Sequence, residues 1–167
     1  GLDSALMSYL LHDARDRLGT GNAFEFITMP GKDAAVVHAT NVRAWIDQRF
    51  NKGAKSKAHT LGNSQLHHSM RVRSAMNSAL ESLPHLDLLL NAANVTPDEV
   101  PNGPVRVNSK NPKIYLPFFH YTKDVLVQLY ADHNLMDLAK ITHTCTESVL
   151  TRCAVCWQCR ERAWAFN

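Results

Sequence analysis

The chain has 167 residues, of which 45% are apolar and 20% are charged, so it is long enough for one globular domain with a buried core. Its 18 Lys and Arg residues against 15 Asp and Glu residues give a net charge of +3, which is too small to argue for direct nucleic-acid binding. No apolar run approaches the length of a membrane span and no signal peptide is evident, so we expect a cytoplasmic protein.

Apolar spacing along the chain predicts helices that alternate with short strands. The first predicted helix runs from Leu2 to Leu18 and is ended by Gly19 and Gly21. Further helices are predicted over residues 36–50, over 72–83, and after Thr122, and strands over residues 23–29, 58–61, 86–90 and 114–116. This alternation predicts an α/β fold with a parallel sheet that helices cover on both faces and with ligands at the carboxyl ends of the strands.

All four cysteines lie close together near the C-terminus, in the pattern Cys145-x7-Cys153-x2-Cys156-x2-Cys159. A disulfide scaffold would spread its cysteines along the chain, so the clustering favours a metal site in a reducing compartment. Thiolates at this spacing can converge on one tetrahedral zinc ion, and four of them leave no position for water or substrate. We therefore expect a structural zinc site, with an iron–sulfur cluster as the competing occupant.

The segment Gly1-Leu2-Asp3-Ser4 stands at the start of the first predicted helix. Helix N-termini bind anions through their unsatisfied N–H groups and the helix dipole, and glycine lets the backbone approach a phosphate closely. The alternative is that Asp3 and Ser4 cap the helix. Both interpretations are open from these residues alone.

Taken together, these segments resemble the PP-loop ATP pyrophosphatases. Gly1-Leu2-Asp3-Ser4 resembles the end of their Ser-Gly-Gly-x-Asp-Ser loop. The cysteine motif, followed by Arg162 and Ala165-Phe166, resembles the zinc motif of one branch, the 7-cyano-7-deazaguanine synthases. Weaker matches to that branch are Pro117-Phe118-Phe119, Lys123-Asp124 and the lead-in to the first cysteine, residues 142–146.

The resemblance implies a single PP-loop α/β domain over residues 1–167, with a Rossmann-like parallel sheet of the adenine-nucleotide α-hydrolase type and helices on both faces. A C-terminal four-cysteine zinc knuckle would occupy residues 142–167. The implied enzyme is an ATP-dependent ligase that adenylates the carboxylate of 7-carboxy-7-deazaguanine, lets ammonia displace AMP, and uses a second ATP to convert the amide to the nitrile. Each round releases AMP and pyrophosphate. The implied cofactors are Mg²⁺ and structural Zn²⁺, and the implied assembly is a homodimer without a nucleic-acid partner.

The resemblance also assigns roles to individual residues. The four residues that would hold the pyrophosphate of ATP are Gly1, Leu2, Asp3 and Ser4. Asp3 would lie near Mg²⁺, Lys123 would neutralise phosphate charge, and the strand end at Thr28 and Met29 would lie near adenine. Arg71 and Arg73 would hold the 7-carboxylate, which a guanidinium fork fits. From the residues alone, Lys123 could equally be a surface lysine, and both arginines could face solvent.

The chain departs from the family in three ways. It lacks the first strand and the Ser-Gly of the loop, it is short, and Asn91-Ala92-Ala93-Asn94 does not reproduce the family's substrate-recognition motif. We therefore expect an N-terminally truncated member with poor activity. Two other functions remain open: a different PP-loop enzyme, such as an amidating ligase or a tRNA thiolase, and a non-enzymatic zinc-binding module. A thiolase would need a catalytic cysteine outside the zinc set, and none remains.

Overall fold

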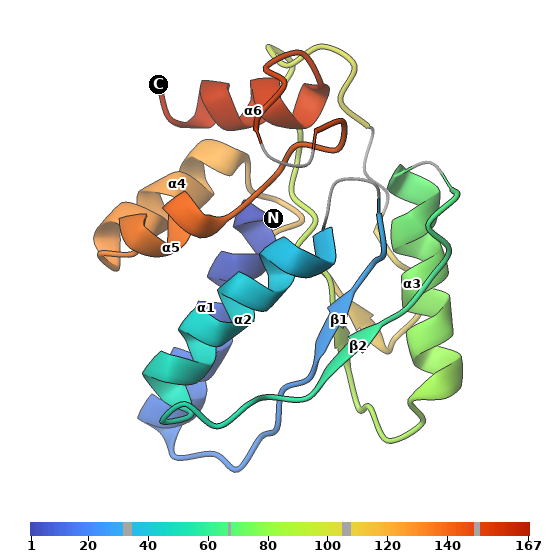
Figure 1. Cartoon of the computed structure of the whole chain (residues 1–167), viewed down its shortest axis with the longest axis vertical. Coiled ribbons are helices and arrows are strands. Elements are labelled where there is room, and N and C mark those ends of the chain that lie inside the picture. The colour runs from blue at the N-terminus through green and yellow to red at the C-terminus, as the bar shows by residue number, and fades with distance from the viewer. Residues whose placement is uncertain (32–34, 67, 105–107, 149–150) are drawn as a thin grey trace.

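The computed structural model of the protein describes residues 1–31, 35–66, 68–104, 108–148 and 151–167. These residues form a mixed α/β fold (Figure 1). The helices are α1 (Leu2–Leu18), α2 (Ala35–Phe50), α3 (His68–Ser82), α4 (Lys123–Asp132), α5 (Met136–Ile141) and α6 (Trp157–Ala165). The strands are β1 (Phe26–Thr28), β2 (Ala58–Thr60), β3 (Leu89–Leu90) and β4 (Ile114–Tyr115). In this part of the chain no helix is long and apolar enough to cross a membrane.

The strands pair in parallel, as predicted, but in two separate sheets. β1 pairs with β2, with Phe26 opposite Ala58, and β3 pairs with β4, with Leu89 opposite Ile114. Over the described ranges no hydrogen-bonded strand joins one pair to the other. The α/β class is therefore confirmed, whereas a continuous Rossmann-like sheet is not seen.

β1 and β3 are shorter than the predicted strands 23–29 and 86–90. The last hydrogen bond of each ladder marks where the pairing ends. Leu61 N–H donates to Thr28 O at 3.0 Å at the end of the β1–β2 ladder, and Asn91 N–H donates to Tyr115 O at 3.0 Å at the end of the β3–β4 ladder. Each strand stops where its short partner stops. Apolar residues outside the ladder therefore belong to loops.

The main core lies among helices, with α1 at its centre. The cluster is made of side chains from α1, α2, α4 and α5 and their connections, and its largest fully buried members include Leu2, Leu6, Ile46, Leu126 and Tyr130. The Tyr130 hydroxyl donates to Leu2 O at 2.6 Å and fixes the start of α1 against α4. Gly19 ends α1 as predicted, in a left-handed conformation (φ 63°) that glycine adopts without steric cost.

Two helices were not predicted from the sequence, α5 and α6. α5 has 6 residues, too few to display a helical period, and the N-cap of α6 is Cys156, which is not one of the usual capping residues. Both helices lie beside the cysteine segment. They are therefore the elements that position the metal site.

The elements that carry the predicted site residues gather toward one end of the molecule. Figure 1 shows β1 and β2 between α2 and α3, and both helices contact β1. The N-terminus of α1, the end of β1 and α6 all lie in the upper half of that view. The carboxyl ends of β1 and β2 point the same way, as expected for parallel strands that lead into a ligand site.

Candidate metal centre

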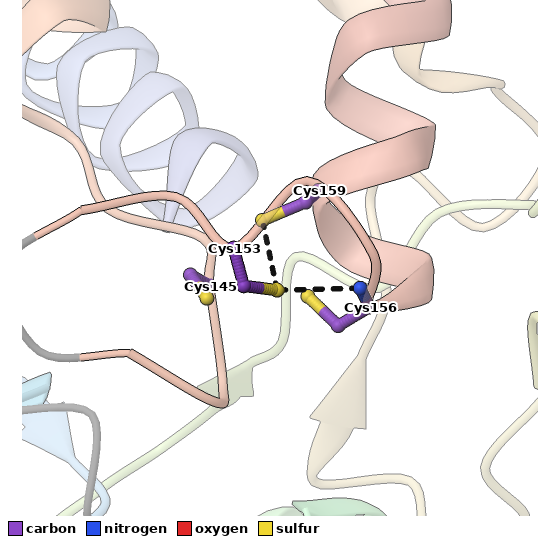
Figure 2. Close-up of side chains that lie close together, drawn as sticks. All are labelled: Cys145, Cys153, Cys156 and Cys159. Carbon is purple, nitrogen blue, oxygen red and sulfur yellow. Dashed lines mark hydrogen bonds between the residues drawn. The ribbon is translucent and has the colours of Figure 1, made fainter.

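The four cysteines come together in space. Figure 2 shows their side chains converging, Cys145 from the loop after α5, Cys153 and Cys156 from the loop before α6, and Cys159 from the first turn of α6. Their sulfur atoms all lie within 4.8 Å of one another, and the Cys153 and Cys159 sulfurs are 4.0 Å apart. Tetrahedral zinc with Zn–S bonds of about 2.3 Å holds its sulfurs about 3.8 Å apart. The arrangement therefore fits one tetrahedral metal ion.

The turn from Cys153 to Cys156 has the local geometry that a metal knuckle requires. Ala154 adopts a left-handed conformation (φ 61°), which turns the chain back on itself. The backbone N–H of Cys156 then donates to Cys153 Sγ at 3.3 Å (Figure 2). An N–H directed at sulfur stabilises the thiolate, which is the form that binds metal.

The electrostatics of the thiols also favour a bound cation. Hydrogen bonds from the backbone of Cys156 and Val155 lower the pKa of Cys153 to about 6. Burial raises the pKa of Cys159 to about 12, because a thiolate without a counter-ion is poorly solvated there. A divalent cation at the centre of the four sulfurs would reverse that penalty and hold all four residues as thiolates.

Hydrogen bonds outside the four sulfurs join the Cys145 loop to α6. The guanidinium of Arg162 donates to Thr142 Oγ1 at 2.7 Å and to Ala139 O at 2.8 Å. Thr146 Oγ1 donates to Gln158 Oε1 at 3.2 Å. These contacts hold the Cys145 loop against α6, so the hydrogen bonds of the fold position Cys145 relative to Cys159.

The start of α1 lies against the same segment. Gly1 is the N-cap of α1, no side chain caps the helix, and a Cβ at Gly1 would lie 3.8 Å from both His143 O and Thr144 Cγ2. Neither Asp3 nor Ser4 is the capping residue, so the capping interpretation is wrong. The first N–H groups of α1 have no acceptor within the helix, as at any helix start. Helix N-termini of this kind are the ones at which anions bind.

Asp3 belongs to a buried charge network with Lys123, Glu161 and Asn94. Lys123 Nζ lies 3.1 Å from Asp3 Oδ2 and 2.5 Å from Glu161 Oε2, and Asn94 Nδ2 donates to Glu161 Oε1 at 3.1 Å. Lys123 is 3% exposed, Glu161 1% and Asn94 2%. The network joins α1, α4, α6 and the loop after β3. The surface-lysine interpretation of Lys123 is therefore wrong.

The charge state of this network follows from its geometry. Burial alone would lower the pKa of Lys123, but the adjacent carboxylates of Asp3 and Glu161 outweigh burial and raise it. One ammonium thus faces two carboxylates. The other oxygen of Asp3, Oδ1, is buried and accepts no hydrogen bond within the described part of the chain. Among the described residues, Asp3 Oδ1 is therefore an oxygen of this network that still lacks a donor.

The remaining predicted residues are spread around this end of the fold. Ser4 is exposed on the first turn of α1, and Thr28 and Met29 are partly buried at the end of β1. Arg71 is buried, and its Nη1 donates to Pro30 O at 3.5 Å, just beyond β1. Arg73 is exposed, so Arg71 and Arg73 do not form a pair. The solvent-facing interpretation fits Arg73 and is wrong for Arg71.

Two residues of the network, Glu161 and Asn94, were not singled out from the sequence. Glu161 lies two residues after the last cysteine, in a segment rich in charged residues, and Asn94 lies in a long irregular loop. Neither position shows a period or motif. Their roles depend on tertiary contacts across 67 positions of sequence, which local patterns do not encode.

Comparison of the chain with protein-family models, with curated proteins and with solved structures gave no match.

Proposed function

We propose that this chain is the catalytic domain of an ATP-dependent carbon–nitrogen ligase of the PP-loop type, acting on 7-carboxy-7-deazaguanine. The observation that carries the proposal is the ion pair between Asp3 and Lys123, which are 120 positions apart in the sequence, at 3.1 Å. Three segments that carry the resemblance, residues 1–4, Lys123 and the lead-in to Cys145, are neighbours in space, although the last two are among its weaker matches.

In the proposed reaction the start of α1 binds the pyrophosphate part of ATP. Its N–H groups and dipole favour negative charge, and exposed Ser4 can donate its hydroxyl. Asp3 Oδ1, which lacks a donor among the described residues, is an oxygen ligand of the type that Mg²⁺ prefers. Mg²⁺ would supply charge neutralisation for the departing pyrophosphate.

Lys123 has a positioning role in this proposal. Its ammonium is enclosed by Asp3 and Glu161 and does not reach solvent, so it acts on phosphate through the carboxylate that it orients. The two strand pairs are separate in the structure; in the proposed domain they would belong to one Rossmann-like sheet, with Thr28 and Met29 beside adenine. Arg71, whose Nη1 donates to Pro30 O just beyond β1, would hold the substrate carboxylate in this proposal.

The chemistry consists of two adenylations. The carboxylate oxygen of the substrate attacks the α-phosphate of ATP and pyrophosphate leaves. Ammonia then displaces AMP to form the amide. The amide oxygen attacks the α-phosphate of a second ATP and pyrophosphate leaves. Loss of AMP and of the two amide protons then leaves the nitrile. These steps need charge neutralisation and positioning more than a protein nucleophile, which fits a site of helix N–H donors, a carboxylate and cations.

The test follows AMP and nitrile by mass spectrometry after incubation with MgATP, ammonium and 7-carboxy-7-deazaguanine. The zinc-loaded chain is assayed as it stands and with a strand and Ser-Gly added before Gly1. Nitrile with about two AMP per product supports the synthase, since each adenylation releases one AMP. Asp3→Asn should abolish turnover, whereas Asp13→Asn, the same change further along α1, should not.

The other outcomes separate the alternatives. AMP formation without nitrile would retain the PP-loop chemistry and reject the deazaguanine substrate. No AMP from either form, with zinc bound, would reject the ligase and leave the zinc-binding module. Equal loss of activity in Asp3→Asn and Asp13→Asn would show that Asp3 acts through helix stability alone.

A further inference from the structure

Two adjoining cavities flank the metal centre and share Lys140 and Arg152 as lining residues. The first, of about 380 Å³, lies between α5 and α6, with its other walls from the loop that carries Arg152. The second, of about 410 Å³, lies between α5 and α2. Each is within the range of small-molecule sites, roughly 300–1,000 Å³.

The two cavities differ in polarity. The first is mainly apolar, with Met136, Ala139, Ala163 and Phe166 among its walls, and Phe166 is 40% exposed. The second is mainly polar, with Thr142, Thr151 and two histidines, His38 and His143, whose rings stack at 4.2 Å. The pair therefore offers an apolar compartment for a planar group next to a compartment of hydrogen-bonding groups.

The charged residues that line the cavities are all cations. Lys140, Arg152 and Arg162 line them, and none of their lining residues is acidic. Arg162 already donates to Thr142 and Ala139. Within the stretches of chain that the structure describes, neither Lys140 nor Arg152 forms a salt bridge. Among the described residues these two cations thus have no ion-pair partner, which is an arrangement that an anionic ligand would complete.

We propose that these cavities form one binding site for a nucleoside 5′-monophosphate. The base lies in the apolar compartment against Phe166, and the phosphate lies in the polar compartment between Lys140 and Arg152. Both cations reach the phosphate from the border of the two compartments. This site is separate from the start of α1, and the proposal does not rest on the proposed ligase activity.

The test is an amide NMR titration of the zinc-loaded chain with AMP, with adenosine and inorganic phosphate as partial ligands. AMP should shift the amides of Lys140, Thr151 and Ala163 and bind more tightly than either partial ligand. Lys140→Gln/Arg152→Gln should raise the Kd for AMP about tenfold, the scale of two exposed charge-assisted contacts. Lys55→Gln/Lys110→Gln removes the same charge elsewhere and should leave the Kd unchanged.

Three results would overturn the proposal. The first is that AMP shifts only the amides at the start of α1, that Ser4→Ala weakens AMP binding, and that the double variant at Lys140 and Arg152 leaves the Kd for AMP unchanged. The second is inorganic phosphate binding as tightly as AMP, which would leave the apolar compartment without a role. The third is no binding at millimolar AMP. The zinc content of each variant shows whether it is folded. Because Arg152 is next to Cys153, the single variant Lys140→Gln is measured as well, since Lys140 is not next to a cysteine.

Discussion

Replacing Lys123 by methionine tests the buried charge network. Lys123 is 3% exposed, and its ammonium lies 3.1 Å from Asp3 and 2.5 Å from Glu161. Its removal leaves two carboxylates facing each other without a cation. Breaking a buried ion pair by deleting one partner typically costs about 3–5 kcal/mol, and we expect a loss of that size in the free energy of unfolding. Such a loss is a large share of the total for a domain of this kind.

A milder change isolates the charge from the packing. Glu161→Gln keeps the shape but leaves one acceptor oxygen, which can serve Asn94 or Lys123 but not both, and it removes the carboxylate charge beside the ammonium. Hydrogen bonds to charged groups contribute about 1.5–3 kcal/mol, so this variant should lose less than Lys123→Met. The double replacement of Lys123 and Glu161 by methionine should cost less than the sum of the two single replacements.

The assay is urea unfolding of the zinc-loaded chain, followed by far-UV circular dichroism. The pKa of Lys123 is raised above 10.5, so its stabilisation is present at neutral pH and is lost only as the pH rises through the folded-state pKa. Lys110→Met, on an exposed loop, should change stability by less than about 0.5 kcal/mol. A loss below about 1 kcal/mol for Lys123→Met would refute the buried network.

Two further predictions concern the other half of the fold. Gly62 has φ 100°, and a Cβ there would lie 3.0 Å from the Ala75 backbone nitrogen, so Gly62→Ala should cost about 1–3 kcal/mol in thermal unfolding. Gly21→Ala, where nothing lies within 4 Å of the added atom, should be close to neutral, and equal losses would contradict the close approach. Burial raises the pKa of Glu25, but hydrogen bonds from His59, Lys57 and His85 outweigh it and lower the pKa to about 2. The stabilisation of the fold by the Glu25 carboxylate is therefore present above pH 4.5 and is lost as the pH falls from about 4.5 to 2. Glu25→Gln should flatten that part of the curve of stability against pH. An unchanged slope would show that the carboxylate is not paired.

The sequence predicts the elements with strong local signals. The apolar period of α1 and the stop at Gly19 give that helix its observed bounds, and the close spacing of the cysteines predicts their convergence. These features depend on residues a few positions apart. Their physical causes, helical periodicity, left-handed glycine and thiolate convergence, act locally.

The features that were missed depend on distant contacts. β1 and β3 end where their partners end, which no single strand encodes. Lys123 resembles a surface residue until Glu161 and Asp3 are placed beside it by α6 and α1. α6 itself begins at the metal-site turn and is joined to the end of α5 by the Arg162 contacts, which connect residues 20 and more positions apart.

The central claim is that all four cysteines hold one structural zinc ion. Zinc X-ray absorption spectroscopy of the purified chain, together with a measurement of its metal content, tests that claim most directly. We predict one zinc per chain and four sulfur neighbours at about 2.3 Å. Cys153→Ser should remove one sulfur from that shell, because Cys153 lies within the cluster. A shell containing nitrogen or oxygen in the unaltered chain, an iron–sulfur spectrum, or less than one metal per chain would contradict the account.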